Sequence, residues 1–161
     1  MNIQQTGISF NSHINGESYQ EIRQGSREIK KFGIKFKTPA YFAESKSDFY
    51  SVFPEPKRVM MNLLRVWNAF SDSEKIRKED YNAYRIWLEE NVGVAWYDLR
   101  TMPMSVERAK AKFGFVGEAN YIIGKDGKYA KLTDALLSFS KYANIGGERA
   151  SGMGVMEYRS E

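Results

Sequence analysis

The residues best suited to chemistry lie in a glycine-rich loop close to the C-terminal end, between Asn144 and Gly154. Four of its glycines fall within nine residues, and Arg149 and Ser151 lie among them. Glycine adopts positive φ and has no Cβ, so such a loop can offer uncovered backbone N–H groups to a phosphate. An arginine adds a fixed positive charge whose guanidinium group can donate two hydrogen bonds to one phosphate. The loop is therefore interpreted as a phosphate cradle, or alternatively as a structural turn between a helix and the last strand.

A second group of candidate residues is a row of lysines on a predicted strand. Lys31, Lys35 and Lys37 alternate with apolar residues between Ile29 and Lys37, the period-2 pattern of a half-buried strand. They could hold a nucleic-acid backbone, or they could be ordinary solvent-facing side chains. Basic charge is also concentrated in two blocks. Residues 23–65 carry ten Lys or Arg against four Asp or Glu, and residues 100–131 carry seven against three. Such blocks favour a polyanion partner.

Acid–base and metal chemistry have few candidates. His13 is the single histidine, and its pKa range suits proton transfer, but its isolated position is also typical of an exposed polar residue. There is no cysteine, and no His/Asp/Glu cluster has the spacing of metal ligands, so we expect no metal and no cofactor.

The elements that must position these residues follow from periodicity and from glycine and proline signals. Residues 1–28 are predicted to be a lead-in with one short strand from Thr6 to Asn11. Thr38-Pro39 is expected to end the strand that begins at Ile29, and Met102-Pro103-Met104 to interrupt the next strand. Gly93 is expected to end one helix, and Thr133 to cap the start of another. The predicted helices are 54–70, with its apolar stripe at Val59, Leu63, Val66, Trp67 and Phe70, then 80–91, and one from Thr133 to Ala143. The remaining strands are 94–101, 113–123 and 155–158.

This order predicts an α+β, ferredoxin-like (RRM-like) βαββαβ domain. Its antiparallel four-stranded sheet has helices on one face and one extra inserted helix. With 161 residues and 42% hydrophobic residues, the chain is expected to form one folded domain over residues 29–161, after the lead-in of residues 1–28. The N-terminus lacks the features of a signal peptide, and no apolar run approaches the ~20 residues of a membrane span, so we expect a soluble, cytoplasmic protein.

Three segments together resemble a known family. They are a proline-led helix with Asn62-Leu63-Leu64-Arg65-Val66-Trp67-Asn68, a strand with Gly114-Phe115-Val116-Gly117, and the glycine-rich loop before the last strand. They resemble the C-terminal half of the CRISPR-associated repeat-RNA endoribonucleases of the RAMP superfamily, over about residues 17–158. Asn144 stands where the family loop has its first glycine, a mild departure because asparagine tolerates the left-handed region.

The resemblance implies CRISPR RNA processing in antiviral defence: binding of repeat RNA by a metal-independent endoribonuclease, in which a 2′-OH attacks in line. Family members usually have two ferredoxin-like domains, with the catalytic histidine in the first. Residues 1–28 resemble the end of such a domain, so a second domain or another CRISPR-associated subunit is an expected partner. The alternatives are a non-catalytic RAMP subunit that holds guide RNA in an effector complex, or a protein-interaction module. The RNA-binding residues expected are Asn144, Gly146, Gly147, Arg149, Ser151, Gly152, Gly154, Lys31, Lys35 and Lys37.

Overall fold

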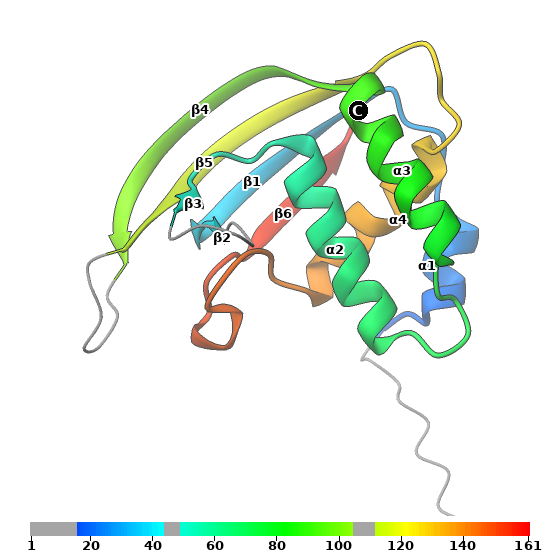
Figure 1. Ribbon diagram of the computed structural model, residues 1–161, viewed down its shortest axis with the longest axis horizontal. Coiled ribbons are helices and arrows are strands. Elements are labelled where there is room, and N and C mark those ends of the chain that lie inside the picture. The colour runs from blue at the N-terminus through cyan, green and yellow to red at the C-terminus, as the bar shows by residue number, and fades with distance from the viewer. Residues whose placement is uncertain (1–15, 44–48, 105–111) are drawn as a thin grey trace, which may run out of the picture.

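The computed structural model describes residues 16–43, 49–104 and 112–161, which form an α+β fold (Figure 1). One antiparallel sheet has the strand order β4-β5-β1-β6, and β2 pairs with β3 in a second, two-stranded sheet. Around the main sheet the chain order is β1-α2-α3-β4-β5-α4-β6, which confirms the ferredoxin-like fold with one inserted helix. The elements are α1 (Tyr19–Gly25), β1 (Lys31–Ala40), β2 (Phe42–Ala43), β3 (Tyr50–Ser51), α2 (Pro56–Phe70), α3 (Lys78–Asn91), β4 (Val92–Met104), β5 (Lys112–Ile123), α4 (Ala130–Phe139), the 3₁₀ turns η1 (Ser140–Tyr142) and η2 (Arg149–Ser151), and β6 (Met156–Ser160).

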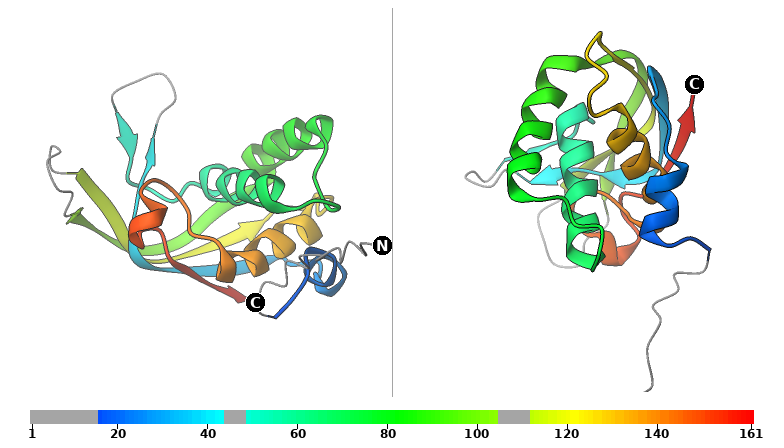
Figure 2. Two further views of the ribbon diagram at one scale, coloured as in Figure 1. Left: turned by 90° about the horizontal axis from the view of Figure 1, so that it is seen from below. Right: turned by 90° about the vertical axis from the view of Figure 1, so that its right-hand side faces the viewer.

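The helices gather on one side of the main sheet, and the β4–β5 hairpin extends beyond them (Figure 2). On β1, Phe32, Ile34 and Phe36 are buried in the core that these helices cover. Phe32 stacks on Tyr121 of β5, with ring centroids 4.8 Å apart. The intervening lysines are exposed on the other face. The alternation in the sequence therefore predicted both the strand and its orientation.

Helix α2 supplies the centre of the core. Val59, Leu63 and Trp67 are fully buried, as the apolar stripe predicts. The prediction for Phe70 is wrong, because its side chain is 71% exposed in the last turn of the helix. The core beside Trp67 is already filled by the rings of Tyr19 and Phe139, at 4.8 and 5.2 Å.

Two prolines were expected to break strands, and neither does. Strand β1 continues through Pro39 to Ala40, because its pairing with β5 shifts register between Phe36 and Ala40 and no ladder hydrogen bond is required at the proline. Strand β4 likewise continues through Pro103 to Met104. It is an edge strand, where a missing N–H can face away from the ladder.

Several predicted boundaries are also wrong. Helix α4 begins at Ala130, and Thr133 lies inside it, where its hydroxyl donates to the Tyr129 carbonyl at 3.0 Å and contacts the Tyr84 hydroxyl at 2.9 Å. Gly93 does not stop α3, since β4 starts directly at Val92. Helix α3 begins at Lys78, slightly earlier than predicted, and the last strand is Met156–Ser160 rather than 155–158.

The lead-in contains a helix that periodicity did not reveal. Ser18 and Glu21 form a capping box at the start of α1: the Glu21 amide donates to Ser18 Oγ at 3.2 Å, and the Ser18 amide donates to Glu21 Oε2 at 2.6 Å. The helix contacts α4, and Tyr19 lies against Phe139. The predicted strand Thr6–Asn11 lies outside the described residues, and the assignment of residues 1–28 to a preceding domain stays a prediction.

Within the described part of the chain, no helix combines the length and hydrophobicity that crossing a membrane requires.

Candidate functional site

The glycine-rich loop runs from the end of η1 to β6 and folds against β1. Gly146 and Gly154 both have a φ of 75°. A Cβ on Gly154 would lie 1.8 Å from the Ile145 carbonyl oxygen, and one on Gly146 would lie 2.3 Å from that of Tyr41. Both positions therefore need glycine for backbone conformation and for space.

The loop amides are less available than the sequence suggests. The Gly147 amide donates to the Tyr41 carbonyl at 3.0 Å, and the Gly146 amide donates to Asn62 Oδ1 at 3.1 Å. The expectation of uncovered N–H groups is thus wrong at these positions. The same holds further along the loop, where the amides of Ser151, Gly152 and Gly154 donate to the carbonyls of Glu148, Arg149 and Pro39.

Side chains remain available on the loop. Arg149 and Ser151 are exposed in η2, and the Arg149 side chain forms no ion pair or hydrogen bond with another described residue. Asn144 is turned toward the loop itself, with its amide nitrogen 3.5 Å from the Arg149 carbonyl oxygen. The guanidinium of Arg149 is therefore accessible to an anion, and its role in RNA binding stays a prediction.

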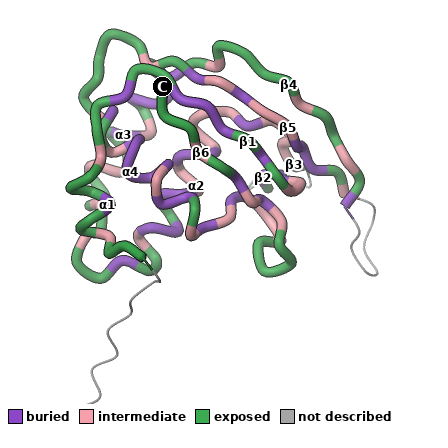
Figure 3. The backbone as a smooth tube through the Cα atoms, turned by 180° about the vertical axis from the view of Figure 1, so that it is seen from behind, coloured by how far each residue is buried: buried purple, intermediate pink, exposed green. Residues whose placement is uncertain are grey.

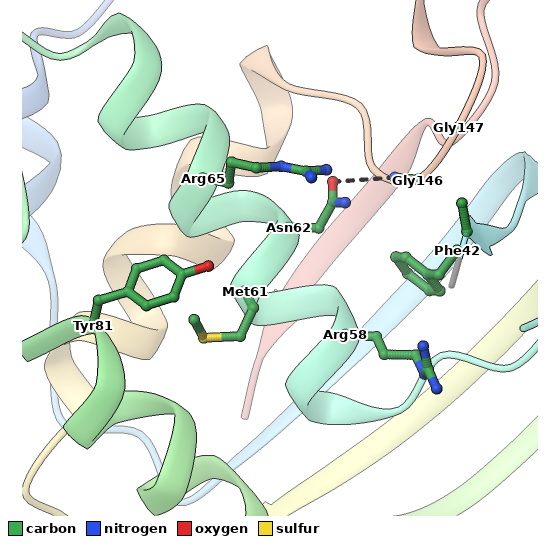
Figure 4. A pocket seen from close by; sticks show the side chains of 9 residues that line it. Phe42, Arg58, Met61, Asn62, Arg65, Tyr81, Gly146 and Gly147 are labelled. Atoms are coloured by element: carbon green, nitrogen blue, oxygen red, sulfur yellow. Dashed lines mark hydrogen bonds between the residues drawn. The ribbon is translucent and has the colours of Figure 1, made fainter. Parts of the chain in front are cut away.

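A groove lies between this loop and α2, with a volume of about 320 Å³ (Figure 4). We call it the α2 groove. Arg65 lies beside Asn62, whose side chain holds Gly146, while Arg58 lies nearer to β2. Tyr81 extends from α3 toward the groove. The lining residues are Phe42, Ala43, Arg58, Met61, Asn62, Arg65, Tyr81, Gly146 and Gly147.

The α2 groove was not predicted from the sequence, in which Arg58 and Arg65 were not among the candidate binding residues. Their spacing with Asn62, at positions i, i+4 and i+7, places all three on one helix face and was the available signal. Arg58 Nε donates to Glu55 Oε2 at 3.0 Å, whereas the Arg65 side chain is exposed and forms no ion pair with another described residue. An exposed guanidinium group with no described carboxylate partner, such as that of Arg65, can bind a phosphate through charged hydrogen bonds.

The strand lysines lie elsewhere, on the open sheet face, which Figure 3 shows from behind. Lys35 Nζ is 3.4 Å from Glu118 Oε1, and Lys37 Nζ is 2.5 Å from Glu157 Oε2. Arg159 also reaches Glu118, at 2.8 Å. Arg159 holds the pKa of Glu118 below its usual range, and Lys37 does the same for Glu157. The structure thus pairs two of the three lysines with carboxylates and does not bring their side chains to the loop.

Among the described residues, no His, Asp, Glu or Lys side chain lines the α2 groove. His13 lies outside the described residues, so its catalytic role stays a prediction. Burial raises the pKa of Tyr84 and of Tyr121, and both hydroxyls are held in the core, that of Tyr121 by the Pro54 carbonyl at 2.9 Å. In the described ranges, no group of three or more His, Cys, Asp or Glu side chains could hold a metal ion.

The fold and the loop together define a class of protein: a ferredoxin-like domain whose last strand follows a glycine-rich loop that closes against the first helix of the motif. The model of the family described as CRISPR-associated endoribonuclease Cas6 matches residues 34–156. The chain belongs to this family. No curated protein matches the sequence.

Solved structures support this assignment. Cas6 (TTHB231) of Thermus thermophilus has a TM-score of 0.80 and 25% identity, with 89% of this chain and 58% of that chain covered. A second Cas6 protein (TTHA0078), in a substrate mimic complex, has a TM-score of 0.72 and 27% identity, with 90% and 58% covered. A partial Cas6-RT-Cas1–Cas2 complex shares the fold, at a TM-score of 0.61 and 12% identity, with 96% and 28% covered. The chain thus spans little more than half the length of the two Cas6 proteins.

Proposed function

We propose that this chain is the RNA-binding ferredoxin-like domain of an endoribonuclease that processes precursor CRISPR RNA in antiviral defence. The observation that carries the proposal is the α2 groove, where Arg65 points toward the glycine-rich loop and Arg58 lines the same groove, in a chain that belongs to the Cas6 family. Repeat RNA is the expected ligand, and its backbone phosphates are the groups that these side chains recognise.

Arg65 and Arg149 are the principal contacts in this account. Both guanidinium groups are exposed and lack a carboxylate partner among the described residues, so an RNA phosphate has no internal anion to displace. Gly146, Gly147 and Gly154 shape the loop by letting it pack closely against Tyr41 and Ile145, and Gly152 supplies a residue with positive φ. Ser151 and Asn144 complete the loop's polar surface. Lys31, Lys35 and Lys37 contribute long-range attraction from the open sheet face.

Cleavage needs groups beyond the α2 groove. In the proposed reaction a 2′-OH attacks the adjacent phosphate in line, with no metal or cofactor, and a histidine serves as acid or base. We propose that a second ferredoxin-like domain or another CRISPR-associated subunit supplies this group, and that the reaction takes place in the cytoplasm. His13→Ala should then leave any cleavage largely intact.

The alternative is a RAMP-type subunit that holds guide RNA and never cuts. It is favoured by the lining of the α2 groove, which includes no His, Asp, Glu or Lys among the described residues. Incubation of the full chain with repeat RNA in EDTA separates the two: cleavage that a single 2′-deoxy substitution at the cut site abolishes supports the endoribonuclease, and stable binding without cleavage supports the subunit.

The test of RNA binding is fluorescence anisotropy with labelled CRISPR repeat RNA. Arg65→Ala should weaken binding roughly tenfold, the size expected for one hydrogen-bonded charged contact. The matched control is Arg77→Ala, which removes an equal charge from the N-cap of α3, at a side chain 79% exposed and paired with Asp80. Equal affinities for the two variants would contradict the assignment of the α2 groove.

A further inference from the structure

The glycine-rich loop contains one residue that does not suit phosphate binding. Glu148 places a carboxylate between Gly147 and Arg149, where it would repel an RNA backbone. Among the residues that the structure describes, it is also the one non-glycine residue with positive φ, at 54°. A carboxylate held at a strained position within an anion-binding loop requires an explanation.

Lys112, the first residue of β5, provides it. Its Nζ lies 2.9 Å from Glu148 Oε1 and 3.4 Å from the Tyr41 hydroxyl, which itself donates to Glu148 at 3.4 Å. The ammonium group also lies 5.3 Å from the centroid of the Tyr41 ring. We call Lys112, Glu148 and Tyr41 the loop latch, because the three come from separate segments and meet only in the folded chain.

The loop latch is continuous with the backbone of the glycine-rich loop. Besides the hydrogen bond from the Gly147 amide to the Tyr41 carbonyl, the Tyr41 ring lies directly on Gly147, where a Cβ would come within 2.3 Å of the ring. The ring of Tyr50 supports Tyr41 from another side, with centroids 5.3 Å apart. The position of the Glu148 carboxylate is thus fixed on one side by the loop backbone and on the other by Lys112.

The ion pair is half-exposed, with side-chain exposures of 35% for Lys112 and 23% for Glu148. The hydrogen bond to Glu148 raises the pKa of Lys112 above its usual range. The ammonium charge therefore persists at neutral pH and above, and it is lost only as the pH rises through that elevated pKa. Under RNA-binding conditions Lys112 remains charged and paired.

We propose that Lys112 is a positioning residue for RNA binding: it neutralises the Glu148 carboxylate and holds it against Tyr41, away from the phosphates. This inference rests on the proposed function and assigns Lys112 no contact with RNA. It makes a distinctive prediction, because removing Lys112 alone exposes a repulsive charge, whereas removing both charges does not.

The test is a double-mutant cycle in the full chain, with affinities for the labelled repeat RNA measured by anisotropy. Lys112→Met should weaken binding about fivefold, the factor given by the repulsion of one nearby unit charge in a water-like environment. Glu148→Gln alone should leave affinity unchanged or slightly higher, and Lys112→Met/Glu148→Gln should return it to within about twofold of the parent. Lys112→Arg keeps the charge and should keep the affinity.

Other outcomes overturn the inference in separable ways. If the double variant stays as weak as Lys112→Met, Lys112 contacts the phosphates itself. If Glu148→Gln weakens binding as much as Lys112→Met does, the pair has only a structural role. The control is the ion pair between Lys57 of α2 and Glu89 of α3, whose Nζ and Oε1 atoms lie 2.5 Å apart. Lys57→Met should not weaken RNA binding, and adding Glu89→Gln should not change the affinity. If the parent chain shows no salt-dependent RNA binding, the proposed function fails, whatever the variants do.

Discussion

The α2 groove with the adjoining glycine-rich loop and the open sheet face both carry basic side chains, but they differ in whether those side chains are paired with carboxylates. On the open sheet face Lys35 and Lys37 are paired with Glu118 and Glu157. Beside the glycine-rich loop, Arg65 and Arg149 have no carboxylate partner among the described residues. Charge that is already paired must lose its partner before it can bind a phosphate, so density of basic residues is a poor guide to an RNA-binding surface. Pairing is the better guide.

The largest expected effect comes from breaking the loop itself. Gly154→Ala places a Cβ 1.8 Å from the Ile145 carbonyl oxygen at a φ of 75°, and we expect a loss of stability on the order of 3 kcal/mol or more together with loss of RNA binding. Gly152→Ala is the matched control, since its φ is 80° but no atom lies within 4 Å of the added carbon. It should cost only about 1 kcal/mol. Chemical unfolding and anisotropy measure both quantities, and similar losses in the two variants would refute the steric argument.

Arg149→Ala should have the next largest effect. The side chain is exposed and unpaired, so its removal should weaken RNA binding roughly tenfold with little change in unfolding temperature. Anisotropy and thermal unfolding are measured on the same sample. An unchanged affinity would remove the glycine-rich loop from the binding surface, and an unfolded variant would give Arg149 a structural role instead.

Lys35→Ala and Lys37→Ala should each weaken RNA binding less than twofold, because half-exposed ion pairs already screen their charge. Lys31→Ala separates the effect of pairing from the effect of position, because the Lys31 side chain is exposed on the same strand and has no ion pair to another described residue. A larger loss of RNA affinity in Lys35→Ala or Lys37→Ala than in Arg149→Ala would contradict the assignment of RNA binding to the glycine-rich loop.

The smallest effect is a pH dependence of stability on the open sheet face. The pKa of Glu118 is lowered by Arg159 and Lys35, so its contribution is fully present above the ordinary carboxylate range and is lost as the pH falls through the lowered pKa. The difference in unfolding temperature between the parent and Glu118→Gln should therefore be greatest near neutrality and shrink in acid. A difference that grows on acidification would contradict this pairing.

Much of the fold followed from the sequence because it depends on local pattern. The alternation on β1 and the apolar stripe on α2 report directly which face meets the core. Boundaries were less accurate where tertiary contacts override local signals: Pro39 continues a strand because the pairing shifts register there, and Thr133 is drawn into α4 beside Tyr84. Helix α1 has too few turns for periodicity, although its Ser18–Glu21 capping box was readable.

In the candidate site, too, local features were predicted from the sequence and contacts between distant segments were not. Glycine content and Arg149 identified the loop in the sequence. The Tyr41 carbonyl that accepts a hydrogen bond from the Gly147 amide, however, lies more than a hundred residues earlier in the chain. The approach of Arg65 to the loop and the pairing of Lys112 with Glu148 are likewise set by packing between distant segments. Spacing alone gives no distance between such segments, and the sequence therefore located the loop but not its partners.

The central claim is that RNA phosphates are held in the α2 groove and by the glycine-rich loop rather than on the open sheet face. The most direct test is the salt dependence of affinity for repeat RNA in two double variants, Arg65→Ala/Arg149→Ala and Lys35→Ala/Lys37→Ala. Each phosphate contact contributes about one unit to the slope of log affinity against log salt concentration. We predict that the arginine variant loses about two units of slope and that the lysine variant keeps the parent slope. A reduced slope in the lysine variant, with the parent slope kept in the arginine variant, would contradict the account.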